Sequence, residues 1–222
     1  MLEKSHKHTL ILSFNSLSSQ EKFFVLRLGF YSIRRNMTFS KTRLLVIFIL
    51  LSIAVILPMR WVDGHLNTPD ACCHFLGRDI CSPVLCFEFA WTTEKANLTL
   101  AAWEDKLHYL TFGFGLDFLF LLLYPVVFFL GLQQIAAQRP LKWLQRIAAF
   151  FAPVALASGM FDAVENICLL RYIFGHQDEW LLKMAGVCAG IKFGLLVLGG
   201  IIIFSGSLAS LYKWTKNWLK KV

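Results

Sequence analysis

The sequence predicts an all-α integral membrane protein, a four-helix bundle with both termini in the cytoplasm. The chain is 57% hydrophobic and only 16% charged, whereas soluble proteins have roughly 45–50% apolar and about 25% charged residues. The apolar residues are gathered into four long blocks, and the basic residues are concentrated in segments that would lie on one side of a membrane. This composition excludes a disordered chain and a small scaffold held together only by disulfides.

Each apolar block is long enough to cross a bilayer core about 30 Å thick, which takes roughly 17–25 helical residues. Pro58 and Arg60 are expected to close the first span. The fourth is rich in glycine, and Gly199, Gly200 and Gly206 would allow close helix packing. The predicted organisation is a basic cytoplasmic segment at 1–43, spans at 44–62, 109–132, 147–174 and 184–212, external loops at 63–108 and 175–183, a basic cytoplasmic loop at 133–146, and a basic cytoplasmic tail at 213–222.

Basic residues predict the orientation, because cytoplasmic loops carry an excess of Lys and Arg. Residues 1–43 hold eight basic residues against two acidic ones, while 133–146 and 213–222 hold three and four basic residues and no acid. The other two loops, counted with Arg60, hold five basic residues against nine acidic ones. The net charge of +8 therefore reflects topology, and no nucleic-acid partner is expected.

Tryptophan gives an independent indication of the span ends, because indole prefers the headgroup level of a bilayer. All seven tryptophans lie at predicted span ends or in loops, as expected for an aromatic belt: Trp61, Trp91, Trp103, Trp143, Trp180, Trp214 and Trp218.

Residues 1–36 mix basic residues with Phe23, Phe24 and Phe30, and could form an amphipathic helix on the membrane surface. A second interpretation is that Met37 is the true start, since from there a short basic region runs directly into the first span. That arrangement resembles a signal peptide, but no small-x-small cleavage site follows Pro58. We therefore expect an uncleaved signal anchor.

The loop at 63–108 opens with four cysteines within fifteen residues. Outside a plasma membrane the compartment is oxidising, so two disulfides are predicted. Adjacent cysteines rarely bond to each other. Two pairings remain open, Cys72–Cys81 with Cys73–Cys86 or Cys72–Cys86 with Cys73–Cys81.

Other chemistries for this loop are less well matched. His65 and His74 lie beside the thiols and could join them in a zinc or copper site, but the spacing fits no standard zinc motif. A quinone-linked disulfide oxidoreductase would need a C-x-x-C pair, and a claudin would need its W…G-L-W…C…C signature; the sequence has neither. We therefore predict no metal and no cofactor. Cys168 and Cys188, inside the spans, are expected to be small apolar packing residues.

An amphipathic helix is predicted after the cysteines, with Thr92 or Thr93 as its cap. We expect it to lie on the outer leaflet and to lead into the second span. Its apolar face consists of Ala96, Leu100, Trp103, Leu107 and Leu110.

Five ionisable residues lie within the predicted spans: Asp117, Asp162, Glu165, Arg171 and Lys192. At mid-span an Asp, Lys or Arg costs about 2.5–3.5 kcal/mol on insertion scales, so such residues normally face the bundle interior and pair. Arg171 is close enough to a span end for its side chain to reach the interface. A rise of about 1.5 Å per residue puts the other four at a similar depth in the outer half, a level that Ser52 could also reach.

Asp162, Glu165 and Asn166 share one face of the third span, because they are three and four residues apart. Ser158 and Gly159 precede them and would let a neighbouring helix approach closely. The predicted intramembrane polar cluster has two interpretations: a network that sets the helix register, with Lys192 neutralising a carboxylate, or a proton or cation relay or polar cargo pocket. Its members are Asp117, Asp162, Glu165, Asn166 and Lys192.

Two short motifs in residues 87–212 carry a resemblance to a known group. The second span contains L-D-F-L-F…Y and the third contains D-x-x-E-N, and in both the chain resembles an uncharacterised group of small bacterial four-helix membrane proteins. The resemblance implies a bacterial inner-membrane location and implies no mechanism. The amino-terminal extension and the paired cysteines are not part of that pattern. The matching residues are Leu116, Asp117, Phe118, Leu119, Phe120, Tyr124, Asp162, Glu165 and Asn166.

The sequence contains no activated nucleophile and no metal motif, which argues against an enzyme. We expect a non-enzymatic interaction or accessory protein of the plasma membrane, surrounded by lipid and able to associate with itself or with another membrane protein. The alternative is a small ion- or proton-coupled transporter or channel that uses the intramembrane polar cluster. It would need an oligomer, because four helices enclose little room. A membrane-embedded enzyme is the third interpretation.

Overall fold

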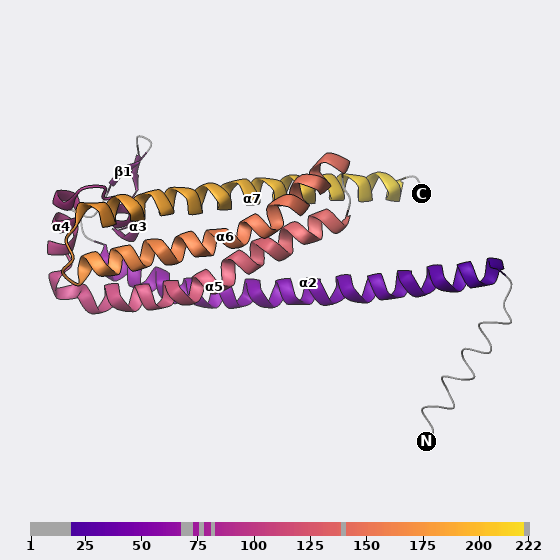
Figure 1. Cartoon of the computed structure of the whole chain (residues 1–222), viewed down its shortest axis with the longest axis horizontal. Coiled ribbons are helices and arrows are strands. Elements are labelled where there is room, and N and C mark those ends of the chain that lie inside the picture. The colour runs from indigo at the N-terminus through magenta and orange to yellow at the C-terminus, as the bar shows by residue number, and fades with distance from the viewer. Residues whose placement is uncertain (1–18, 68–72, 76–77, 81–82, 139–140, 220–222) are drawn as a thin grey trace, which may run out of the picture. The chain divides into compact units, whose positions relative to one another are not determined.

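The computed structural model describes residues 19–67, 73–75, 78–80, 83–138 and 141–219, with side chains described from residue 41 onward except in the two short strands. Almost all of these residues are helical (Figure 1). The chain divides into two units, residues 1–43 and 44–222, and the bundle belongs to the second. The elements are α2 (Ser19–Leu66), β1 (Cys73–Phe75), β2 (Arg78–Ile80), α3 (Pro83–Glu88), α4 (Thr93–Ala101), the 3₁₀ turn η2 (Glu104–Lys106), α5 (Leu107–Gln138), α6 (Lys142–Ile173) and α7 (Glu179–Leu219).

Four helices in the described part of the chain are long and apolar enough to cross a membrane, as the sequence predicts. They cover Lys41–Leu66, Glu104–Gln138, Lys142–Ile173 and Glu179–Leu219. The predicted surface helix at 1–36 lies partly outside the described residues, and its described part, 19–36, belongs to α2.

Helix α2 does not end at Pro58 and Arg60, the residues expected to close the first span, but continues to Leu66. A proline inside a helix removes one backbone hydrogen bond and bends the chain. Beyond it, Val62 and Leu66 are fully buried against the rest of the bundle. This apolar burial stabilises the last two turns of α2.

Helices α5, α6 and α7 pack against one another and form the centre of the bundle (Figure 1). Glycine allows the closest approaches: a Cβ atom at Gly159 of α6 would lie 2.9 Å from the carbonyl oxygen of Leu121 in α5. Gly206 of α7 likewise leaves no room for a Cβ beside Ile135. By contrast, the space beside Gly200 is open, so the predicted packing role does not extend to that residue.

Two apolar clusters occupy opposite parts of the bundle. The turn cluster, near the connection between α5 and α6, consists of Leu132, Ile135, Leu144, Ala148, Ala152 and Ala155. The loop-end cluster gathers the ends of α2, α6 and α7 with α3 and α4, and includes Val62, Leu66, Phe87, Trp103, Leu110, Leu169, Tyr172 and Leu182.

Trp103 belongs to the loop-end cluster and not to an aromatic belt. It is completely buried, and its indole nitrogen donates a hydrogen bond to the carbonyl oxygen of Leu66 at 2.9 Å. The prediction fails for this residue because the loop folds back over the bundle and covers it. The other six tryptophans are 42–64% exposed, as a belt requires.

The predicted amphipathic helix is interrupted, and part of its apolar face packs on protein. The side chain of Thr92 caps α4 by accepting a hydrogen bond from the Lys95 amide at 3.4 Å. The helix ends at Ala101, and the chain passes through η2 before α5 begins. Ala96 is fully buried in the loop-end cluster, and Tyr172 donates a hydrogen bond to Asn97 at 2.8 Å. Part of the apolar face therefore packs on the bundle, whereas Leu107 of the same face is exposed.

The all-α prediction misses one short antiparallel sheet. Strands β1 and β2 pair with Cys73 opposite Ile80 and Phe75 opposite Arg78. Cys86 lies in α3 and is disulfide-bonded. The side chains of Cys72, Cys73 and Cys81 lie outside the described residues, so both disulfide pairings stay predictions. Cys168 and Cys188 are buried free thiols.

Candidate functional site

Lys192 is the centre of a buried ionic cluster between α6 and α7. Its ammonium nitrogen lies 2.9 Å from Asp162 Oδ1 and within 3.0 Å of both carboxylate oxygens of Glu165. The three residues are at most 5% exposed. Asp162 and Glu165 can both bind the same ammonium because they are about one helical turn apart on the same face of α6.

Asp117 joins the cluster through Asn166 of the same α6 face. The Asn166 amide nitrogen donates a hydrogen bond of 2.7 Å to Asp117 Oδ2. Asn166 is 1% exposed, whereas Asp117 on α5 is partly buried. The structure therefore brings together all five members of the predicted intramembrane polar cluster, from three different helices.

Other polar residues of the predicted spans lie elsewhere. Ser52 is buried on α2, but its hydroxyl forms no hydrogen bond within the described part of the chain. Arg171 is exposed near the end of α6, consistent with a side chain that reaches the interface. Tyr124, from the second-span motif, is buried on α5.

The cluster has a further acidic member, Glu88, that is not among the residues predicted from the sequence. Glu88 is the last residue of α3, in the loop, yet its Oε2 lies 3.9 Å from the Lys192 nitrogen. It is 8% exposed. The sequence contains one signal for its burial. Glu88 is the single acid in the apolar run Phe87–Trp91, and a run of this kind tends to pack against the protein and to take the acid inward with it.

Aromatic packing on both sides of Glu88 fixes its position near α7. Phe87 is fully buried in the loop-end cluster, edge-on to Trp103. Trp91 adopts a positive φ of 57°, which a non-glycine residue tolerates only when its surroundings enforce it. Its ring lies over Gly186 of α7, where a Cβ would come within 3.0 Å of the indole. Glu88 is therefore positioned by an aromatic residue on each side.

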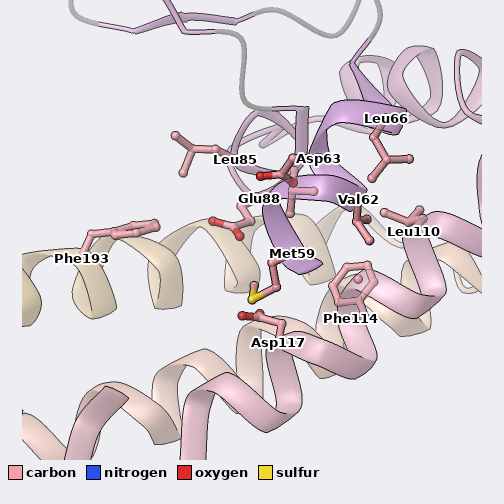
Figure 2. A pocket seen from close by; sticks show the side chains of 12 residues that line it. Met59, Val62, Asp63, Leu66, Leu85, Glu88, Leu110, Phe114, Asp117 and Phe193 are labelled. Atoms are coloured by element: carbon pink, nitrogen blue, oxygen red, sulfur yellow. The ribbon is translucent and has the colours of Figure 1, made fainter. Parts of the chain in front are cut away.

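Glu88 and Asp117 also line a pocket of about 300 Å³ between α2, α3 and α5. Asp63 of α2 supplies a third carboxylate, and Figure 2 shows the three acids arriving from three different helices, with Met59 between Glu88 and Asp117 in that view. Most of the remaining wall is apolar: Val62, Leu66, Val84, Leu85, Leu110, Phe114 and Phe193, with Gly113. The pocket therefore combines a hydrocarbon wall with concentrated negative charge.

The electrostatics of the site are unbalanced. One ammonium, that of Lys192, is surrounded by the carboxyl groups of Asp162, Glu165, Glu88 and, through Asn166, Asp117. Burial raises the pKa of the Glu88 carboxyl well above its usual range; Lys192 opposes this shift, and the neighbouring acids reinforce it. Charged groups away from water are costly unless paired. The arrangement can therefore take up positive charge.

Comparisons with known proteins add no assignment: no family model matches the chain, and no curated protein or solved structure is significantly similar to it. The acids of the two motifs noted in the sequence, Asp117 on α5 and Asp162 and Glu165 on α6, meet at the cluster described above. Within the described residues, no three His, Cys, Asp or Glu side chains are grouped to hold a metal ion.

Proposed function

We propose that this chain is a non-enzymatic multi-pass protein of the plasma membrane that takes up protons at the Lys192 cluster from the outer side. In this proposal both termini are cytoplasmic, the pocket faces outward, and the membrane is a bacterial inner membrane. The orientation is supported by the distribution of basic residues, and the membrane by the motif resemblance. Proton uptake would then serve either coupled transport or a response passed to a partner.

The observation that carries the proposal is the charge imbalance around Lys192. A network that only sets helix register needs no more acids than its cation and hydrogen-bond donors can satisfy. Here three carboxyl groups lie within 4 Å of one ammonium, and a fourth, that of Asp117, is bonded to Asn166. Up to three negative charges therefore remain to be neutralised. Protons are the least bulky way to neutralise them inside a membrane.

The pocket supports exchange with one side of the membrane. Glu88 and Asp117 line it, so protons can reach the cluster through it. Ala155 lies seven residues before Asp162 on α6, roughly 10 Å along the helix at its usual rise, and belongs to the apolar turn cluster. This apolar layer favours one-sided proton binding over an open channel, and full transport would require a second conformation or an oligomer.

Infrared difference spectroscopy of the protein in lipid nanodiscs tests proton uptake directly. When the pH is lowered, we expect the wild type to gain bands from protonated carboxyl groups in a non-aqueous environment. Glu88→Gln and Asp117→Asn should each remove part of that signal, because each deletes an acid that lines the pocket. The matched control Glu104→Gln removes an exposed acid and should leave the bands unchanged.

If the wild type gains no such band anywhere in its stable pH range, the cluster does not exchange protons and the proposal is wrong. Proton flux in proteoliposomes then separates the two uses of proton uptake. Flux that Glu88→Gln abolishes supports coupled transport, whereas proton uptake without flux supports a response passed to a partner.

A further inference from the structure

Among the described residues that line the pocket, Glu88 has a buried carboxylate oxygen without a hydrogen-bond partner. Oε2 of Glu88 accepts no hydrogen bond from the described part of the chain, although only 8% of the residue is exposed. Its closest cation, the Lys192 nitrogen, is 3.9 Å away and is engaged by Asp162 and Glu165. A buried acceptor in this state destabilises the folded protein unless a partner satisfies it.

The pocket also has the size and lining of a small-molecule site. Its volume of about 300 Å³ is at the lower end of the range of roughly 300–1,000 Å³ for ligand pockets, which are mostly apolar with a few convergent polar groups. Phe114, Leu110 and Leu66 form part of the apolar wall, and the carboxyl groups come from three separate elements. Carboxylates recognise cationic donors, and the aromatic walls can stabilise a nearby cation further.

We infer that this pocket binds an organic ammonium ligand carrying a short apolar group. The ammonium would donate hydrogen bonds to Glu88 and its acidic neighbours, and the apolar group would lie against Phe114 and Leu110. The inference deepens the proposed function, because the ligand would replace protons at the same carboxyl groups. Only one part of the inference, the release of protons when the ligand binds, rests on the proposed function.

Anions and neutral lipids fit this pocket poorly. Asp63, Glu88 and Asp117 would repel an anion, and a purely hydrocarbon ligand would leave Glu88 Oε2 unsatisfied. The same ammonium group could belong to a free amine or to the head group of an amine-bearing lipid. The pocket recognises the ammonium group, which both sources share. The experiment must therefore distinguish a free amine from a lipid.

Three probes with the same chain and different head groups test the charge requirement: hexylammonium, hexanol and hexanoate. Binding is measured by calorimetry on the protein in phosphatidylcholine nanodiscs, with empty nanodiscs subtracted. We expect hexylammonium to bind at least tenfold more tightly than the other two. Equal binding of all three would mean that they only partition into apolar space, and it would overturn the inference.

Variants locate the binding site. Asp63→Asn combined with Glu88→Gln should weaken hexylammonium binding at least tenfold, and Val84→Phe should weaken it by filling the pocket without changing its charge. Glu104→Gln, which removes an exposed acid, should bind as the wild type does. Circular dichroism confirms that each variant is folded. Unchanged affinity in both folded pocket variants would place binding elsewhere and overturn the inference.

Repeating the titration in nanodiscs that contain phosphatidylethanolamine separates the two sources. Competition by that lipid identifies its head group as the occupant, and undiminished affinity identifies a free amine; both results require that hexylammonium binds. Proton release on binding, measured in buffers of different ionisation enthalpy, links the site to the proposed function. Binding without proton release leaves the inference standing and removes its link to the proposed function, which the infrared titration tests separately. Proton uptake without amine binding overturns the inference and leaves the proposed function standing.

Discussion

At the scale of single residues, Lys192 is the cation around which the buried acids of the bundle gather. It is the one ammonium among four carboxyl groups in the cluster, and its direct partners are both on α6. Removing one partner of a buried ion pair costs about 3–5 kcal/mol in soluble proteins. Hydrogen-bond couplings inside membranes average about 0.6 kcal/mol, because helices that have separated find other partners.

Replacing Lys192 tests which acids depend on it. Lys192→Met should lower the thermal stability in detergent modestly, because Asp162 and Glu165 lose their shared cation. Adding Asp162→Asn or Glu165→Gln should restore part of that stability, whereas adding Asp117→Asn should not, because Asp117 is held by Asn166. Unfolding followed by tryptophan fluorescence measures each step. If Lys192→Met leaves the thermal stability unchanged, the ion pairs of Lys192 do not stabilise the bundle.

Glu88 predicts how stability depends on pH. Its pKa is about 4.5 when unfolded, and burial raises the pKa in the folded protein. Between these two values the folded state binds more protons than the unfolded state, so stability is highest below the unfolded pKa and falls as the pH rises toward the folded one. The slope from one such proton is at most about 1.4 kcal/mol per pH unit.

The Glu88 contribution can be isolated by substitution. Glu88→Gln should flatten the decline in stability as the pH rises above the unfolded pKa of about 4.5, measured from chemical denaturation in detergent. Exposed Glu104→Gln serves as the control and should keep the wild-type slope. If Glu88→Gln and the wild type lose stability in parallel, burial of Glu88 is not the cause.

At the scale of elements, the site depends on how α3 is held against α7. Trp91 lies over Gly186 with a strained backbone, and Glu88 is three residues before it. This contact sets how deeply a loop residue reaches toward Lys192. The helix that carries Lys192 therefore also positions the acid that faces it.

A leucine at Gly186 should lift α3 from α7. Even a Cβ added there would lie only 3.0 Å from the Trp91 ring, so the larger leucine side chain must displace the ring. Glu88 would then contact water, and its infrared titration midpoint should move down toward 4.5, its value when unfolded. Gly190→Leu is the matched control, since nothing lies within 4 Å of a Cβ on that residue one turn further along α7. Equal effects of the two substitutions would contradict this positioning role.

At the scale of the whole molecule, the bundle has one polar level between two apolar clusters. The loop-end cluster closes one end around α3 and α4, and the turn cluster fills the bundle near the α5–α6 connection. The pocket is at the loop end, so its access depends on which side of the membrane that end faces.

Reporter fusions test the proposed orientation. A reporter that is active only in the periplasm should be silent when fused after Val222 and active when inserted near Asn67, because the basic segments are expected to stay in the cytoplasm. Cytoplasmic reporters at the same two sites provide the reciprocal control. The opposite pattern would place the pocket on the cytoplasmic side and contradict uptake from outside.

The sequence by itself determined the features that depend on neighbours along the chain. A continuous apolar segment must form a helix in lipid to satisfy its own backbone, and the four spans follow from that. The helical repeat puts Asp162, Glu165 and Asn166 on one face, and the rise per residue puts Asp117 and Lys192 near the same depth.

Only the tertiary structure decided how the loop folds onto the bundle. Glu88 is 104 residues from Lys192 in the printed sequence, and no local period connects them. Its position depends on the burial of Phe87 and Trp103 and on the Trp91–Gly186 contact. The same packing covers Trp103 and forms the pocket with Asp63. Local patterns predict helices and their faces, whereas a site built from a loop and three helices depends on long-range packing that no local repeat encodes.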